Sequence, residues 1–342
     1  MTDFWQYLKN SSKPIFLYGM GNGADKIIDT LDTLGIRVSG VFASDGFVRN
    51  KTFRGFKLQS YSDVCDKYDD FTVLLSFGTS IKEVIENIKY IASHRRLFAP
   101  DLAVFGDGFI DCEFCQKNKE RLEMIYSSLA DEISKNTFEN ILKFKISGDI
   151  SYLLNCESSP SEPFENFLNL NKDTVFVDLG AYRGDTLCEY IERVGGYKKA
   201  YAVEPDKKTF EKLLKTNLEN TVYVNAAVSD KQGVCFFESQ AGRGSHVSSS
   251  GIEIESVCVD SLLCGQKPDY IKMDVEGAEK QAIDGAKNTI VKYKPKLCIS
   301  AYHRAYDLLD IPEQIFSIRK DYKIYLRHFP YIPAWDTNYY FI

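Results

Sequence analysis

The sequence of 342 residues lacks the long apolar runs of membrane-spanning helices, since none approaches the span of about 18 residues that a bilayer requires. Its first residues, MTDFWQYLKNSSKP, also lack a basic region followed by an apolar core and a small-residue cleavage site. We therefore expect no membrane span and no secretory signal, and a cytoplasmic location.

Excess positive charge is also missing. The chain has 42 Lys and Arg against 48 Asp and Glu, a formal net charge of −6. Proteins that bind nucleic acids in general present a basic face to the phosphates. The charge balance therefore predicts no nucleic-acid partner.

Paired cysteine motifs are absent too. Of the nine cysteines, Cys112 and Cys115 form the single C-x-x-C, whereas a zinc ribbon needs a second pair. An odd number of cysteines at irregular spacing, in a long chain without a signal, is typical of reduced thiols. We expect neither a disulfide framework nor a structural zinc site.

The chain does contain two series of alternating strand and helix patterns, and its length favours two domains. A helical pattern at 118–145 and a Ser/Pro-rich stretch at 155–163 separate the two series. We predict an α/β fold, because parallel strands joined by helices form doubly wound sheets. The predicted parts are a smaller Rossmann-like α/β domain, a helical connector and a second α/β domain, at 1–115, 116–163 and 164–342.

The stretch DTVFVDLGAYRGDT, at 173–186, is the first candidate ligand loop. In open α/β sheets ligands bind beyond the carboxyl ends of the strands, which places 178–184 on the functional rim. Gly180 and Gly184 can adopt backbone angles closed to other residues, and Gly180 would let a ligand approach the main chain.

The charges near this loop favour a cationic ligand. Asp178 and Asp185 disfavour a pyrophosphate, which prefers the bare positive end of a helix. Glu204 ends the next expected strand, where a carboxylate can accept both hydroxyls of a ribose, and Arg183 can meet a carboxylate. S-adenosylmethionine combines a sulfonium, an ammonium, a carboxylate and a ribose, so we predict it as the cofactor. The predicted contacts are Asp178, Gly180, Arg183, Gly184, Asp185 and Glu204. The alternatives remain that the loop only begins an ordinary α/β unit and that Arg183 faces solvent.

Five segments of the second half resemble the FkbM family of S-adenosylmethionine-dependent O-methyltransferases. They are VFVDLGAYRGDT, YAVEPDKKTFEKLLKTN, NAAVSD, VDSLL and DYIKMDVEGAEKQAIDGA, within about 173–342. The resemblance implies a class I methyltransferase sheet of seven strands with the last antiparallel, and cofactor contacts at Asp178, Gly180 and Glu204. Family members commonly methylate hydroxyls of sugars and polyketide-type natural products. We therefore expect methyl transfer to a hydroxyl of a sugar, glycan precursor or related natural product.

A hydroxyl acceptor needs a base, and two residues are placed for that role. Asp274 belongs to the family's D-x-E-G, with Glu276 and Gly277, and ends one expected strand. His303 ends the next, and its ordinary pKa of about 6.5 would leave it largely neutral. We predict Asp274 and His303 as catalytic residues, with His303 as a capping or core histidine the alternative. A divalent ion on Asp274, Glu276 and His303 is possible but not favoured, and Glu276 can instead cap the following helix.

The other histidines give weaker signals. Arg327 and His328 occupy opposite faces of a late strand, so one of them can line the pocket. His246 lies in a Gly/Ser loop that suits an acceptor-binding flap or an ordinary surface loop, and His94 is expected in solvent.

The loop GMGNGAD, which contains Gly19, Gly21 and Gly23, is a second candidate nucleotide loop. Asp45 follows at about the spacing of a dinucleotide-binding acid. Two alternative functions result: an NAD(P)-binding sugar-modifying enzyme that uses this loop, and a non-catalytic binding or scaffold protein. We favour a non-catalytic role for the loop, because no hydride-transfer apparatus can be assigned around it. An oligomer is possible.

Overall fold

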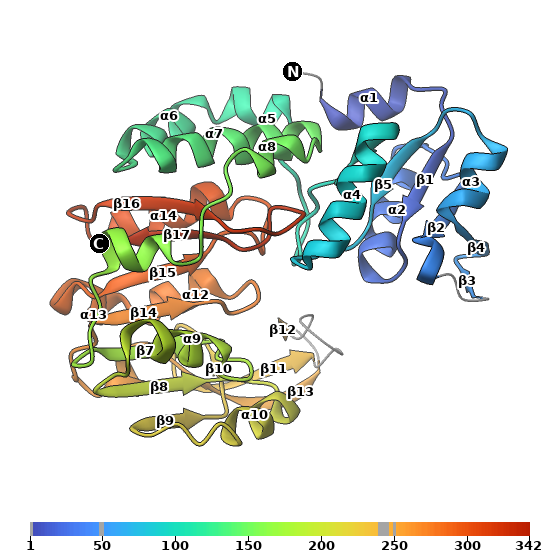
Figure 1. Cartoon of the computed structure of the whole chain (residues 1–342). Coiled ribbons are helices and arrows are strands. Elements are labelled where there is room, and N and C mark those ends of the chain that lie inside the picture. Colours follow the sequence, from blue (N-terminus) through green and yellow to red (C-terminus); the bar gives the residue numbers. More distant parts are fainter. Residues whose placement is uncertain (1–2, 48–50, 239–245, 249–250) are drawn as a thin grey trace.

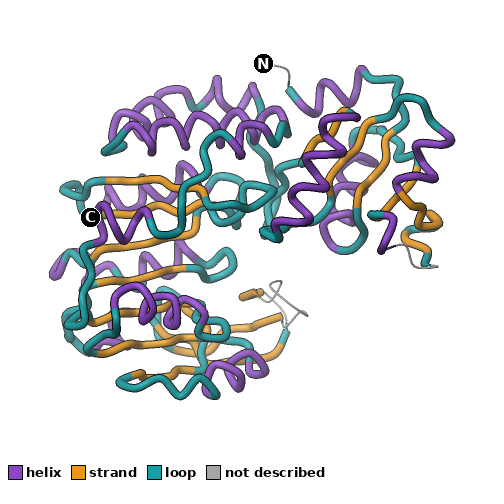
Figure 2. The backbone as a smooth tube through the Cα atoms, viewed as in Figure 1, coloured by secondary structure: helices purple, strands orange, loops and turns teal. Residues whose placement is uncertain are grey.

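The computed structural model describes residues 3–47, 51–238, 246–248 and 251–342. They form an N-terminal sheet unit, a group of helices and a C-terminal sheet unit (Figure 1). Figure 2 shows the strands in separate N-terminal and C-terminal groups, with the connecting helices beside the C-terminal one.

The N-terminal unit contains a six-stranded sheet in the order β3-β4-β2-β1-β5-β6. Neighbouring strands are parallel except β3 and β4, which form a hairpin. The parallel strands follow the Rossmann order, as the sequence predicted. The strands are β1 (Ile15–Tyr18), β2 (Gly40–Ala43), β3 (Thr52–Phe53), β4 (Phe56–Ser60), β5 (Thr72–Leu75) and β6 (Arg96–Phe98). The helices are α1 (Phe4–Asn10), α2 (Asn22–Thr33), α3 (Tyr61–Lys67) and α4 (Lys82–His94), with a 3-10 turn η1 (Asp45–Phe47).

The helices that follow are α5 (Cys112–Lys117), α6 (Lys119–Ser128), α7 (Glu132–Ser147) and α8 (Ser151–Leu154), before a π-helical turn η2 (Phe164–Leu168). The single helical stretch expected from the sequence is therefore divided between α6 and α7. Asp131 explains the break, because its carboxylate accepts a hydrogen bond from the Ser134 amide at 2.7 Å and so caps α7.

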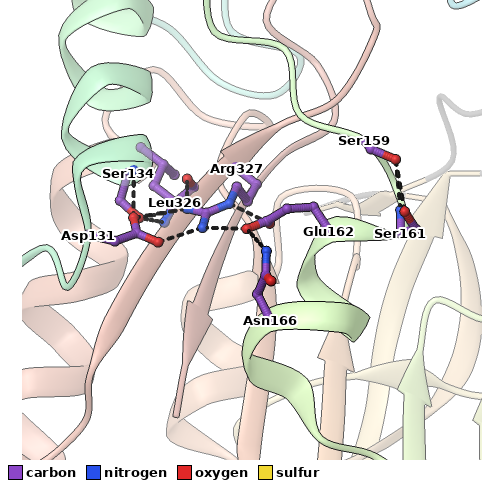
Figure 3. Close-up of polar contacts among 8 residues, drawn as sticks. All are labelled: Asp131, Ser134, Ser159, Ser161, Glu162, Asn166, Leu326 and Arg327. Carbon is purple, nitrogen blue, oxygen red and sulfur yellow. Dashed lines mark hydrogen bonds and ion pairs between the residues drawn. The ribbon is translucent and has the colours of Figure 1, made fainter.

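A buried arginine ties these helices to the C-terminal sheet (Figure 3). Arg327 is 0 % exposed, and its guanidinium lies 2.6 Å from Asp131 Oδ2 and 2.6 Å from Glu162 Oε2. His328 is also fully buried, and its Nδ1 lies 3.0 Å from Thr337 Oγ1. The expectation that one of the two lines the pocket is wrong, because internal partners hold Arg327 and burial removes His328 from solvent.

The C-terminal unit contains a seven-stranded sheet in the order β16-β17-β15-β14-β7-β8-β9. Only β17 is antiparallel to its neighbours, as the family resemblance implied. The strands are β7 (Val175–Leu179), β8 (Lys199–Val203), β9 (Thr221–Val224), β14 (Tyr270–Met273), β15 (Lys296–Ser300), β16 (Ile324–His328) and β17 (Thr337–Phe341). The helices are α9 (Asp185–Val194), α10 (Lys207–Leu214), α11 (Val259–Leu263), α12 (Glu279–Asp284), α13 (Lys287–Tyr293) and α14 (Asp307–Ile318).

Two features of this unit differ from the expectation. A separate four-stranded sheet, in the order β10-β13-β11-β12, lies between β9 and β14 in sequence. Its strands are β10 (Ala227–Val228), β11 (Gly233–Glu238), β12 (His246–Ser248) and β13 (Ile252–Val257). The sequence pattern predicts one helix over Glu279 to Val291. The structure divides this stretch into α12 and α13 at Gly285, where a Cβ would lie 2.3 Å from the Ser229 carbonyl oxygen.

In the described part of the chain, the helices are too short or too polar to cross a bilayer.

Candidate functional site

The loop between β7 and α9 lies at the carboxyl edge of the C-terminal sheet. Gly180 and Gly184 have φ of +83° and +84°, which favours glycine at both positions. A Cβ on Gly180 would lie 1.9 Å from the carbonyl oxygen of Asp274. The missing side chain therefore lets the end of β14 approach this loop, a reason that the sequence did not reveal.

Asp178 presents a buried carboxylate without a partner. The residue is 0 % exposed, and neither carboxylate oxygen has a hydrogen-bond partner among the described residues. Burial raises the pKa of Asp178 to about 7, although the nearby charge of Lys272 opposes this. A buried polar group without a partner is costly, so this carboxylate suits a ligand that supplies a hydrogen bond or a positive charge.

Glu204 follows β8 and is 7 % exposed. Its Oε2 accepts a hydrogen bond from the Tyr182 amide at 3.0 Å, and its Oε1 accepts one from the Asp206 amide at 2.9 Å. Burial raises its pKa to about 7. Glu204 thus holds the β7–α9 loop in place, and each oxygen keeps a second lone pair for a ribose hydroxyl.

The remaining predicted cofactor residues lie nearer to solvent. Arg183 and Asp185 are exposed, and the guanidinium carbon of Arg183 lies 4.9 Å from the ring centre of Tyr182. The structure therefore gathers Asp178, Gly180, Gly184 and Glu204 around one loop, with Arg183 and Asp185 on its outer side.

Asp274 and His303 come together after the parallel neighbours β14 and β15. His303 Nε2 lies 3.6 Å from Asp274 Oδ1 and 3.4 Å from Glu276 Oε2. On the other side of the ring, Nδ1 donates to Glu279 Oε1 at 2.8 Å. Glu279 also accepts from the Val275 amide at 3.0 Å, so Glu279, and not Glu276, holds the turn before α12.

The charge state of His303 differs from the expectation. His303 is 1 % exposed, and burial alone would lower its pKa. The carboxylates of Glu279, Glu276 and Asp274 outweigh burial and raise the pKa well above 6.5. These surroundings favour the protonated imidazole, and not the neutral form that the sequence suggested.

The pKa values of the two acids beside the imidazole are shifted in opposite directions. Burial would raise the pKa of Asp274, but the charges of Lys272 and His303 hold it well below its usual range. Burial raises the pKa of Glu276, with His303 opposing. The Asp274 side chain remains 31 % exposed and accepts a hydrogen bond from the Tyr302 hydroxyl at 3.1 Å. Asp274 can therefore meet an acceptor, whereas His303 lies behind it.

Asp274, Glu279 and His303 each offer one ligand atom, and these atoms lie within 4.8 Å of one another. Two oxygens and one imidazole nitrogen suit a divalent ion. However, Glu279 and His303 are already hydrogen-bonded to each other, and no ion is needed to hold the group together. The absence of a metal stays a prediction. The sequence reasoning missed Glu279, although an acid that opens the helix after D-x-E-G was a usable signal.

The glycine-rich N-terminal loop has packing reasons for two of its glycines. A Cβ on Gly19 would lie 2.5 Å from the Phe77 ring, and one on Gly23 would lie 2.3 Å from the Ser76 carbonyl oxygen. Asp45 accepts a hydrogen bond from the Ser62 amide at 3.1 Å. These contacts explain the two glycines by close packing of the loop and α2 against the residues after β5, and they give Asp45 an internal partner. NAD(P) binding stays a prediction.

Three weaker predictions concern the rest of the chain. His94 is exposed at the end of α4. Cys112 and Cys115 are free thiols. The Gly/Ser loop around His246, expected as a flap or surface loop, lies mostly outside the described residues.

Comparison with known proteins identifies the C-terminal part. Residues 178–324 match the family model described as "Methyltransferase FkbM domain". This part of the chain is an FkbM methyltransferase domain. The matched range contains every predicted cofactor and catalytic residue, and it begins at the unpartnered Asp178. No curated protein matches the sequence.

In a comparison of structures, the similarity to an FkbM methyltransferase covers nearly the whole chain. The structure is similar to that of methyltransferase FkbM from Methylobacillus flagellatus KT, with a TM-score of 0.72 and 22% identity, over 99% of this chain and 92% of that one. A precorrin-6y C5,15-methyltransferase from Geobacter metallireducens GS-15 aligns with a TM-score of 0.33 and 14% identity, over 51% of this chain and 81% of that one. Fibrillarin from Aeropyrum pernix, solved with natively bound S-adenosyl-L-methionine, aligns with a TM-score of 0.32 and 11% identity, over 50% of this chain and 67% of that one.

Proposed function

We propose that this FkbM methyltransferase uses S-adenosylmethionine to methylate a hydroxyl of a sugar, glycan precursor or related natural product. The observation that supports it best is the unpartnered, fully buried carboxylate of Asp178 beside Glu204. Asp274 ends the neighbouring strand β14 and is partly exposed. A site for a cationic, ribose-bearing cofactor and a carboxylate for the acceptor thus share one edge of the sheet.

The residues around the β7–α9 loop fit this cofactor. S-adenosylmethionine supplies a methyl group on a positively charged sulfur when it is bound. Asp178 offers its two free oxygens to positive charge or to a bridging water. Glu204 offers its remaining lone pairs to the ribose hydroxyls, and Gly180 and Gly184 shape the main chain between them. Arg183 and Asp185 would complete the outer side of the site.

Asp274 is the proposed catalytic residue for the acceptor. Its carboxylate accepts a hydrogen bond from the hydroxyl and orients the oxygen, since methyl transfer depends mainly on alignment. Because the charges of Lys272 and His303 make Asp274 a weak base, it takes the proton only as the new bond to the methyl group makes the hydroxyl acidic. His303 is buried and hydrogen-bonded to Glu279, and we assign it the role of holding Asp274 in position. This assignment revises the predicted role of His303 as the base itself.

The cofactor prediction is tested with S-adenosylhomocysteine, which lacks the methyl group. We expect it to raise the melting temperature of the chain, because a ligand that binds only the folded state stabilises it. Asp178→Asn should abolish most of this shift, and Glu204→Gln should weaken it. Asp173→Asn is the matched control, because Asp173 is exposed before the other end of β7. A shift with NADH and none with S-adenosylhomocysteine would instead favour the NAD(P) alternative, and no shift with either would favour the scaffold alternative.

Two further variants test the reaction itself. Asp274→Asn should keep the S-adenosylhomocysteine shift and lower turnover of a hydroxyl acceptor about 10²- to 10⁴-fold. Glu276→Gln is the comparison, because both acids face His303 Nε2. A larger loss at Glu276 than at Asp274 would move the proton acceptor to Glu276.

A further inference from the structure

A segment outside the matched residues 178–324 lies directly against the catalytic turn. The linker segment, residues 99–111, runs from β6 to α5. Within it, the Phe105 amide donates to the carbonyl oxygen of His303 at 2.9 Å. The rings of Phe105 and His303 lie 6.0 Å apart.

Close packing against Phe105 helps to explain why the last residue of D-x-E-G is a glycine. Gly277 has φ of +88°, and a Cβ there would lie 3.0 Å from Phe105 Cδ2. The Gly277 carbonyl accepts from Arg304 Nε at 2.6 Å, in the residue that follows His303. Phe105 therefore packs where the loop after β14 and the loop after β15 meet.

The turn that Phe105 covers contains a strained residue. Glu276 has φ of +52°, a strained conformation for a residue other than glycine, which persists only where the surroundings enforce it. Phe105 on one side and the Glu279–Val275 hydrogen bond on the other supply such surroundings. Without Phe105, the turn that carries Asp274 and Glu276 would lose packing on one side.

The linker segment is also attached on both of its sides. Lys26 of α2 donates from Nζ to the Ala103 carbonyl at 3.0 Å, and to that of Val104. Beyond the segment, Phe114 of α5 stacks on Tyr306 with ring centres 4.8 Å apart. The position of Phe105 thus depends on the N-terminal unit as well as on the methyltransferase domain.

We propose that Phe105 is a positioning residue for methyl transfer, and that the N-terminal unit holds it on the catalytic turn through Lys26. The proposal rests on the proposed function of the site. The N-terminal unit then contributes to turnover without binding a ligand at its glycine-rich loop.

The experiment compares Phe105→Ala with the conservative Phe105→Leu. We expect Phe105→Ala to lower kcat about ten- to a hundredfold, because small displacements of reacting groups are costly. The affinity for S-adenosylhomocysteine should change less than about twofold, since the β7–α9 loop is untouched. Phe105→Leu should recover most of kcat. Hydrogen exchange of peptides over 274–279 and 301–306 should be faster in Phe105→Ala alone.

Lys26 is tested in parallel with Lys26→Met and Lys26→Arg. The first should lower kcat and speed exchange over 301–306, and the second should restore both, because a guanidinium can still donate to the two carbonyls. Lys9→Met is the control, because Lys9 is exposed on α1.

The outcomes separate the two hypotheses. A wild-type chain that binds no S-adenosylhomocysteine and methylates no acceptor overturns the proposed function, and the positioning role falls with it. An active wild type with an equally active Phe105→Ala overturns the positioning role alone. Equal losses of cofactor affinity and kcat in Phe105→Ala would also overturn it, because they indicate general unfolding.

Discussion

Two buried histidines of the C-terminal unit show that the effect of burial on the pKa depends on the neighbouring charges. His303 is buried among carboxylates, which raise its pKa well above the ordinary value. His328 is buried without such a countercharge, and burial lowers its pKa to about 3. The same side chain is therefore expected to be charged at one position and neutral at the other.

His328 should make the fold sensitive to acid. Its pKa in the unfolded chain is about 6.5, so as pH falls from there towards 3 the unfolded state binds a proton that the native state does not. Native stability should then fall by up to about 1.4 kcal/mol per pH unit from this group. Urea unfolding at pH 7.5 and pH 5.0 measures the loss. His328→Asn should lose less stability between the two pH values than the wild type, with His94→Asn as the exposed control. An unchanged pH slope in His328→Asn would contradict the expectation.

At the scale of elements, the candidate site depends on how closely two strand ends approach each other. Gly180 follows β7, and its Cα faces the carbonyl of Asp274 after β14. The two loops therefore cannot move independently, and the cofactor loop and the catalytic turn share one backbone contact.

A pair of glycines with the same backbone angle can separate strain from contact. Gly180 and Gly265 both have φ of +83°, but a Cβ on Gly265 would meet nothing within 4 Å. Gly265→Ala should cost only the backbone strain, roughly 1–3 kcal/mol. Gly180→Ala should cost more and should also abolish S-adenosylhomocysteine binding. Urea unfolding and calorimetry measure both quantities, and equal effects of the two variants would refute a special role for the Asp274 contact.

The sequence predicted those elements whose signal is local. Apolar runs marked the parallel strands, and the meeting of strand ends at one edge placed Asp178, Glu204, Asp274 and His303 near one another. The division of the helix at Gly285 was missed because its cause, the Ser229 carbonyl, is distant in sequence. Phe105 was missed as a partner of His303 for a similar reason, since this contact joins residues distant in sequence. Glu279, in contrast, had a local signal, because it is the acid that opens the helix after D-x-E-G.

At the scale of the whole molecule, the connecting helices are bound to the C-terminal sheet by charge as well as by packing. Arg327 of β16 is fully buried between Asp131, which caps α7, and Glu162, which precedes η2. A domain boundary at 163/164, as predicted from the sequence, would remove both acids and leave the arginine in place.

Two fragments test where the C-terminal unit begins. The fragment 164–342 should be less stable than 116–342 by about 3–5 kcal/mol or more, because an uncompensated charge would remain buried. Arg327→Met should stabilise 164–342 and destabilise 116–342, which separates the charge effect from the lost helices. Urea unfolding followed by circular dichroism measures the four proteins. If Arg327→Met shifts both fragments in the same direction, the ion pairs do not decide the boundary.

The position of β17 also sets an order of assembly during synthesis. This strand contains residues 337–341 but lies between β15 and β16. Until β17 has been synthesised, β16 has no neighbour in the sheet. The turn between α6 and α7, whose Ala130 amide donates to the Ile324 carbonyl oxygen at 2.8 Å, then lacks part of the surface that it binds. The N-terminal sheet, complete by residue 98, can form much earlier. During synthesis we therefore expect the N-terminal sheet to form while the C-terminal sheet still lacks β17 between β15 and β16.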